Sequence, residues 1–365
     1  MKEKLVVIGN GMSGLRTIED LLEIDKNRYE ITIYGEEPHV NYNRIMLSYI
    51  LSQEKTFEDT IINHQSWYEQ NNITLHKGDK IVSINKKDKT IKSESGKTES
   101  YDKLLIATGS TAFIPKTKGS DLENVIAFRT KADVDAIIST IRKDKTAVVV
   151  GSGLLGLEAA YGIAKHGIKT ILVHRSGSIL SQQLDSTGGR LLQKNLESYG
   201  IEFKLNTTIE EISGDGIVEK VSFTDGVCVD SNLVVFATGI VLNTALANDA
   251  NLETKKGIIV DDFLKTSDDS IFAIGECVEH DGNTYSNEYV ENVFGLDYST
   301  NLSEIMEVAP RSSTIDKYIN AYLILFGKKK EKEADLMLQK LKDYLGGEIP
   351  NLLQKEIDNQ KKAYL

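Results

Sequence analysis

The pattern of apolar residues repeats along the chain. Residues 5–8 are all apolar and predict a buried strand, a helical spacing of apolar residues continues to about Ile24, and residues 31–34 predict a second strand. The same order returns later, where apolar strands at 147–150 and 170–173 flank a second helical stretch. Each copy is therefore expected to fold as a β-α-β unit with parallel strands.

A Gly-x-Gly-x-x-Gly motif lies between strand and helix in both copies. Alone, the motif is equally typical of an ordinary glycine-rich turn, but this context is the one in which a helix N-terminus receives a pyrophosphate. The first glycine permits the tight turn, the second a close backbone approach, and the third the packing of helix on strand. The expected nucleotide-binding residues of the two turns are Gly9, Gly11, Met12, Ser13, Gly14, Gly151, Gly153, Leu154, Leu155 and Gly156.

The two copies differ where their second strand ends. Glu36 and Glu37 follow the first copy, where a carboxylate can bind the two hydroxyls of a ribose, although a charged turn is the alternative interpretation. His174 and Arg175 occupy the corresponding place in the second copy, which has no acid there. Because a guanidinium can pair with a 2′-phosphate, this end favours NADPH over NADH, and an arginine without function remains the alternative.

Three further strands end in small residues. Two of them are near duplicates that end in Ala107-Thr108-Gly109 and in Ala237-Thr238-Gly239, and the third ends in Gly275-Glu276. Small residues allow the backbone to approach a ligand or a neighbouring strand closely. Each fragment by itself is better explained by structure than by binding.

Bulk composition narrows the class of protein. The formal net charge of −11 disfavours a nucleic-acid partner, and 40% hydrophobic with 27% charged residues is typical of a globular protein without membrane spans. The two cysteines form no Cys-x-x-Cys pair, which favours a reducing cytoplasm, and the six histidines show no metal-ligand spacing. No metal site is therefore expected.

These motifs together resemble the pyridine nucleotide–disulfide oxidoreductase superfamily, in the branch that lacks a redox disulfide. The resemblance is strongest to the N-terminal flavoprotein part of NAD(P)H-dependent nitrite reductases and to NADH:rubredoxin reductases, and it extends over residues 1–296. The segments that carry it are Gly9-Asn10-Gly11-Met12, Tyr34-Gly35-Glu36-Glu37-Pro38, Tyr42-Asn43-Arg44, Tyr101 through Ser110, Gly153 through Ala160, Gln183-Leu184-Asp185 and Ile274-Gly275-Glu276-Cys277.

The resemblance implies an α/β protein with two nested Rossmann-like domains. Residues 1–112 and 242–296 would form a split FAD-binding domain, and residues 113–241 would form the NAD(P)-binding domain inserted between its halves. A helical C-terminal segment would follow at 297–365, where the resemblance ends. Apolar residues at helical spacing there are Ala334, Leu336, Leu338, Leu341, Tyr344 and Leu345.

The resemblance also assigns site residues. Arg44 would lie near the FAD pyrophosphate, Glu276 would bind a ribityl hydroxyl where the superfamily commonly has Asp, and Glu158 would lie beside the nicotinamide. Hydride would pass directly between the two bound rings, so no catalytic side chain is expected.

The resemblance further implies that electrons pass from NAD(P)H through FAD to a separate acceptor, either a small protein such as a rubredoxin or ferredoxin, or a nitrite reductase subunit. Neither a nucleic acid nor a membrane is expected as a partner. The divergent tail leaves alternatives open. It could pack on the core or on a second copy in a homodimer. The chain could also be a sensor, or a decayed flavoprotein, that binds FAD and NAD(P) without turnover.

Overall fold

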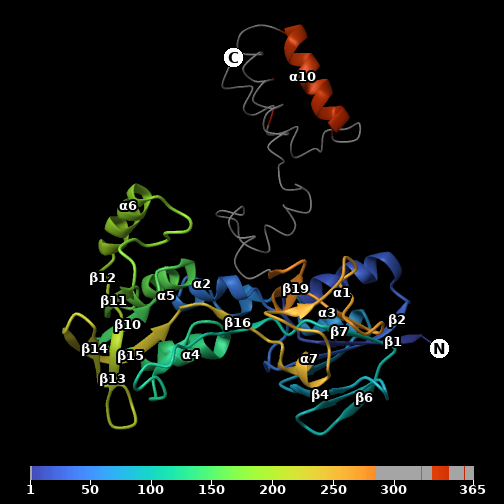
Figure 1. Ribbon diagram of the computed structural model, residues 1–365, viewed down its shortest axis with the longest axis horizontal. Helices are drawn as coiled ribbons and strands as arrows, with labels where there is room; N and C mark the ends of the chain where they lie inside the picture. Colours follow the sequence, from blue (N-terminus) through green and yellow to red (C-terminus); the bar gives the residue numbers. More distant parts are fainter. Residues whose placement is uncertain (1, 285–321, 323–330, 345–356, 358–365) are drawn as a thin grey trace. The chain divides into compact units, whose positions relative to one another are not determined.

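The computed structural model describes residues 2–284, 322, 331–344 and 357 of the 365-residue chain. The chain divides into two compact units, Met1–Val293 and Phe294–Leu365, and each is considered by itself. Two sheets with helices around them make up most of the first unit (Figure 1). Among the helices of the described residues, none is long and apolar enough to cross a membrane.

A five-stranded sheet contains the first glycine motif. Its strands lie in the order β18-β7-β1-β2-β3, and all neighbours are parallel. The bounds are β1 Glu3–Ile8, β2 Tyr29–Gly35, β3 Thr74–Lys77, β7 Lys103–Ile106 and β18 Ile271–Ala273. Helix α1 (Met12–Asp25) connects β1 to β2 and buries Leu15 and Ile18. The first expected β-α-β unit is confirmed.

A seven-stranded sheet contains the second glycine motif. Its order is β12-β11-β10-β15-β14-β13, and β9 pairs with β15. The bounds are β9 Val125–Ala127, β10 Thr146–Val150, β11 Lys169–His174, β12 Ile201–Leu205, β13 Ile209–Ser213, β14 Lys220–Phe223 and β15 Cys228–Phe236. Helix α5 (Leu154–Ala164) joins the parallel strands β10 and β11, so the second β-α-β unit is also confirmed.

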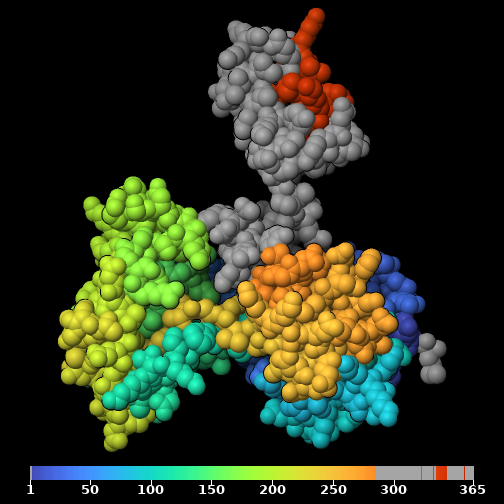
Figure 2. All heavy atoms as spheres, in the orientation of Figure 1, coloured from blue at the N-terminus to red at the C-terminus, as the bar shows by residue number. Residues whose placement is uncertain are grey.

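The second sheet is inserted in the chain between strands of the first. Strand β18 pairs with β7, although more than a hundred residues, including the strands of the other sheet, separate the two strands in the sequence. In Figure 2 the orange atoms accordingly lie against blue and cyan ones. The chain crosses between the sheets through β8 (Ser110–Ala112) and β16 (Ile240–Leu242), which pair antiparallel. The expected nesting is thus confirmed, and the domain boundaries at 112 and 242 stay a prediction that falls in this ribbon.

One segment from the first half packs under the second sheet. The short helix α2 (Leu47–Leu51) follows η1 (Arg44–Met46) directly, and it buries apolar side chains in one core with α4 (Lys131–Thr140) and α5. Gly162 of α5 makes room, because a Cβ atom there would lie 2.8 Å from the Leu51 Cγ atom. Residues 44–51 therefore form a packed contact between the part of the chain that contains the first sheet and the helices of the second.

Smaller elements complete the first unit. They are η2 Glu58–Thr60, α3 Gln65–Gln70, β4 Ile81–Asn85, β5 Thr90–Ser93, β6 Thr98–Ser100, α6 Ser186–Glu197, α7 Ala245–Asp249, β17 Ile258–Ile259, η3 Gly275–Cys277, β19 Val278–His280 and β20 Asn283–Thr284.

The second unit has one described helix, α10 (Glu331–Tyr344). Ala334 and Leu341 are buried and share one face, as the helical spacing predicts, whereas Leu336 is 54% exposed and lies off that face. The helical expectation is confirmed for these residues. The remainder of the predicted C-terminal segment, including Leu345, and residues 285–296 of the predicted FAD-binding domain lie outside the described residues.

Candidate functional site

The first glycine turn is shaped by its neighbouring strands. Gly9 has φ +112°, donates its amide hydrogen to the Tyr34 carbonyl at 2.8 Å, and lies so close to Ala107 that a Cβ atom would overlap the Ala107 carbonyl oxygen. Only glycine fits this conformation and this space. The predicted Ala107 therefore lies directly beside the predicted Gly9, and its carbonyl explains why the turn needs a glycine.

The helix that follows this turn begins without a side-chain cap. Gly11 is the extended N-cap of α1, no side chain hydrogen-bonds to the cap, and a Cβ atom at Gly11 would meet no described atom within 4 Å. The first helical turn, from Met12 through Gly14, thus begins with N–H groups that no side chain caps, next to the open space at Gly11. An anion such as a phosphate fits this place, since it would supply the missing hydrogen-bond acceptors.

The second glycine turn repeats this geometry. Gly151 has φ +114° and a Cβ atom there would overlap the Ala237 carbonyl oxygen, and Gly153 is the uncapped N-cap of α5 with open space around it. Leu154 and Leu155 on the first helical turn are 47% and 39% exposed. The residues present therefore fit a second phosphate-bearing ligand, with two apolar side chains available to contact it.

The threonine and glycine of each Ala-Thr-Gly motif bond to the segments through which the chain crosses between the two sheets. Thr108 and Asn243 exchange two hydrogen bonds at 3.0 and 2.8 Å. Thr238 donates to the Phe113 carbonyl at 2.8 Å, and the Gly239 carbonyl accepts from the Phe113 amide. The Asn243 amide likewise donates to the Gly109 carbonyl. These contacts give Thr108, Gly109, Thr238 and Gly239 a structural role beside the glycine turns.

Of the two acids after β2, Glu37 lies at the centre of a hydrogen-bonded cluster. Its carboxylate accepts from the Tyr42 hydroxyl at 2.7 Å and from the Arg44 guanidinium at 2.5 Å. Each carboxylate oxygen keeps a free lone pair, so Glu37 can still accept hydrogen bonds from a diol. Glu36 points away to Lys80 at 2.7 Å and its side chain is 64% exposed. The geometry favours Glu37.

An arginine that the sequence did not single out joins this cluster to Glu276. Arg44 donates to the Arg129 carbonyl at 3.0 Å, and the Arg129 guanidinium bonds to both Glu276 and the Ser110 hydroxyl. The buried Nε of Arg129 has no hydrogen-bond partner in the described part of the chain. The sequence indicates Arg129 only indirectly, because Arg129 precedes Thr130, which begins α4 with a capping box.

Gly275 brings Glu276 to the first glycine turn. A Cβ atom at Gly275 would lie 2.8 Å from the Ser13 Oγ, so the end of β18 and the start of α1 touch. Gly11, Glu37, Arg44 and Glu276 thus belong to one connected region, and a polar ligand held there would find carboxylate acceptors and a free Arg129 donor.

The strand end of the second copy has a different chemistry. Arg175 is exposed, and its guanidinium has no ion pair or hydrogen bond with the described residues. Burial, and then the charge of Arg175, lower the pKa of His174. Because neutral His174 and cationic Arg175 replace the carboxylates of the first copy, this end favours an anionic group.

Glu158 lies on α5, which packs against α2. Burial raises the pKa of its carboxyl group above the usual value, and the side chain of Ser48, on α2, lowers it in part. The packing of α2 on α5 joins the inserted sheet to the segment that carries Arg44.

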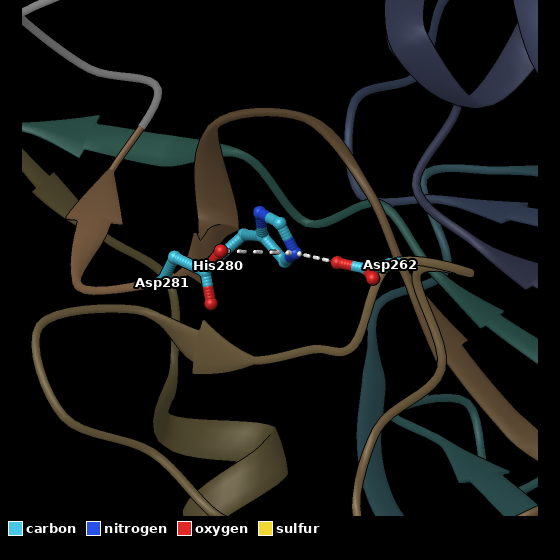
Figure 3. Close-up of side chains that lie close together, drawn as sticks. All are labelled: Asp262, His280 and Asp281. Carbon is cyan, nitrogen blue, oxygen red and sulfur yellow. Dashed lines mark hydrogen bonds and ion pairs between the residues drawn. The ribbon is translucent and has the colours of Figure 1, made fainter.

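A group of three potential metal ligands also occurs in the described residues, at the end of β19 (Figure 3). The His280 Nε2 lies 2.8 Å from an Asp262 carboxylate oxygen and 4.0 Å from one of Asp281. The sequence did not anticipate this group. A hydrogen bond between His280 and the largely exposed Asp262 accounts for the closer contact.

The two cysteines are both free. Cys228 is exposed and Cys277 is buried beside the Ile106 and Ile274 carbonyls. No disulfide joins these two residues in the described part of the chain.

Comparison with known proteins identifies relatives of this arrangement. A family model described as pyridine nucleotide-disulphide oxidoreductase matches residues 3–306. A nitrite reductase [NAD(P)H] of Bacillus subtilis is 42% identical over 284 residues, which are 78% of this chain and 35% of that protein. An assimilatory nitrate reductase electron transfer subunit of the same organism is 41% identical over 284 residues, 37% of its length. The chain thus spans about a third of the length of these relatives.

A solved structure shares the fold. The NADH:rubredoxin oxidoreductase of Clostridium acetobutylicum superposes with a TM-score of 0.67 at 28% identity, over 78% of this chain and 71% of that one. The α/β fold with two nested dinucleotide-binding units, expected from the sequence, is therefore confirmed.

Proposed function

The chain belongs to the pyridine nucleotide-disulphide oxidoreductase family, and from this premise we propose that it binds FAD at the first glycine turn and NAD(P)H at the second. Electrons would then leave for a separate acceptor, either a small protein of the rubredoxin or ferredoxin type or a subunit of a nitrite reductase. One observation carries the proposal: Gly11 and Gly153 both begin helices without side-chain caps, and both face open space.

The strand ends support the proposal of FAD at the first turn and NAD(P)H at the second. Glu37 would bind the ribose of the FAD adenosine, and Arg44, which neutralises Glu37, would approach the pyrophosphate. Ser110 and Arg129 would orient the Glu276 carboxylate toward the ribityl chain. When both nucleotides are bound, the nicotinamide supplies a hydride and the flavin receives it.

At the second turn, Arg175 supports a preference for NADPH. A guanidinium that has no ion-pair partner among the described residues can pair with a 2′-phosphate, and the strand end has no carboxylate to repel it. Leu154 and Leu155 would cover the apolar parts of the nucleotide, and Glu158 would lie near the nicotinamide.

The acceptor is proposed from the relatives. One relative is by name an electron transfer subunit and a solved structure of the same fold is a rubredoxin oxidoreductase. Cys228 and Cys277, both free, suit the reducing cytoplasm in which we place the chain.

Anaerobic titration of the FAD-loaded chain tests the proposal. We expect the blue absorbance of oxidised flavin to bleach on addition of NADPH, and more slowly with NADH at equal concentration. Adding a one-electron acceptor protein should restore the absorbance. The absence of any flavin spectrum after supply of FAD would refute the proposal, and tight NAD(P)H binding without bleaching would instead favour the sensor.

A further inference from the structure

The hydroxyl group of Tyr42 joins two distant parts of the chain. It lies 2.7 Å from the Glu37 Oε2, and it accepts the backbone N–H of Lys131 at 3.3 Å. Because a backbone N–H can only donate, the single proton of the hydroxyl is left for Glu37. Burial raises the pKa of the Tyr42 hydroxyl, which therefore keeps this proton. Tyr42 is thus a constant hydrogen-bond donor to Glu37.

The side chain of Tyr42 is held in place on several sides. Its residue is 6% exposed, and its main chain forms an antiparallel bridge with that of Ile61. The centroid of its ring lies 5.3 Å from that of Phe57, and the Arg44 guanidinium lies over the same ring at 5.4 Å. The position of the hydroxyl therefore follows from the packing of the ring.

The group that donates to Tyr42 belongs to the start of helix α4. Lys131 is the first residue of this helix, and the N–H groups of a first helical turn have no partner within the helix. Thr130 accepts from the Asp133 N–H, and Asp133 accepts from the Thr130 N–H. Tyr42 accepts from the N–H of Lys131. One role of Tyr42 is therefore to complete the cap of α4, and this role involves no ligand.

The second role concerns the two oxygens of the Glu37 carboxylate, which are held by different donors. Arg44 bonds to Oε1 at 2.5 Å, and Tyr42 bonds to Oε2 at 2.7 Å. A single donor would let the carboxylate turn about its Cγ–Cδ bond, because this torsion has no sharp minima. Two donors fix the plane. Since the Glu37 side chain is still 27% exposed, its remaining lone pairs have a set direction before any ligand binds.

We propose that Tyr42 is a positioning residue that fixes the Glu37 carboxylate for the two hydroxyls of the adenosine ribose of FAD. The inference rests on the proposed function, which assigns this ribose to Glu37. A carboxylate that is already held in one plane loses less rotational freedom when the diol binds, and this preorganisation raises the affinity. Tyr42 acts through Glu37 alone, and no covalent bond forms or breaks.

Two ligands that differ only at the ribose test the inference. They are FAD and an FAD analogue whose adenosine ribose lacks both hydroxyls, and fluorescence titration gives a dissociation constant for each. In the wild type the analogue should bind about tenfold more weakly, the equivalent of one hydrogen bond to a charged group. Tyr42→Phe keeps the ring and its packing, but the carboxylate can turn. The ratio of the two dissociation constants should therefore fall by about threefold.

Tyr68→Phe is the matched control. Tyr68 is also buried, and its hydroxyl also joins an acceptor to a backbone N–H, since it donates to the Asn10 Oδ1 at 2.9 Å and accepts from the Asn41 N–H at 3.2 Å. Its loss should leave the ratio of the two dissociation constants at the wild-type value. FMN, which has no adenosine, should bind to the wild type and to Tyr42→Phe with equal affinity.

The outcomes separate this inference from the proposed function. A ratio in Tyr42→Phe equal to or above that of the wild type overturns the inference and leaves Tyr42 with the cap of α4 alone, while the binding of FAD still stands. A loss of FMN affinity as large as the loss of FAD affinity would mean a general structural effect and would also overturn it. If the wild type binds no FAD, or binds both ligands equally, the assignment of the ribose to Glu37 fails, and the inference fails with it.

Discussion

The two glycine turns have the same backbone design and different surroundings. In both, the first glycine lies against the carbonyl of an Ala-Thr-Gly strand end and the second begins an uncapped helix. The strand that follows ends in Glu36 and Glu37 in one copy and in His174 and Arg175 in the other. The comparison supports the proposal that the turn would provide a general phosphate site, whereas the neighbouring strand end would select the nucleotide.

The copies also differ in how tightly the third glycine is packed. A Cβ atom at Gly14 would lie 3.2 Å from the Gly9 carbonyl oxygen and from the Ala107 Cβ, but at Gly156 it would overlap the Gly151 carbonyl oxygen. The first turn of α5 therefore lies closer to its own glycine turn than the first turn of α1 does.

Substitution of the third glycine should give the largest difference in stability between the two turns. Gly156→Ala forces the helix away from its turn and should destabilise the chain by about 3 kcal/mol, whereas Gly14→Ala should cost about 1 kcal/mol, since its neighbours can shift by a few tenths of an ångström. Urea unfolding followed by circular dichroism measures both. Equal losses would mean that the two turns are packed alike.

Substitution of the second glycine should separate the two ligands. A methyl group at Gly11 or Gly153 meets no described atom, so both Ala variants should keep the stability of the wild type within about 0.5 kcal/mol. Gly11→Ala should weaken FAD binding at least tenfold, because the methyl group would occupy the phosphate position. Gly153→Ala should retain FAD and weaken NAD(P)H to a similar extent. Equilibrium titrations with each nucleotide would contradict the assignment if the effects were reversed.

The smallest expected effect concerns the strand ends. Arg175→Ala should raise the KM for NADPH roughly tenfold and leave that for NADH nearly unchanged, because one charge-assisted hydrogen bond to the 2′-phosphate is lost. Arg142→Ala is the control, since Arg142 lies before β10, at the opposite strand end, and bonds to the Ser139 and Ile141 carbonyls. Steady-state kinetics with both nucleotides will show equal changes if Arg175 has no such role.

The local patterns of the sequence were sufficient to predict the two β-α-β units. Apolar runs, helical spacing and the glycines between them are encoded within about thirty residues, so they need no knowledge of distant contacts. The contact of Gly9 with Ala107 is repeated by that of Gly151 with Ala237. In both copies the strand that leads into Ala-Thr-Gly pairs with the strand before the glycine turn.

Only the tertiary structure decided which side chains meet across the two sheets. Arg129 and Glu276 are separated by 147 positions, and Leu51 lies against Gly162 because α2 packs on α5. The choice of Glu37 over Glu36 likewise came from the direction of each side chain toward Arg44 or Lys80. Such contacts depend on how whole elements pack, and the free energy of that packing is spread over many residues that no short motif contains.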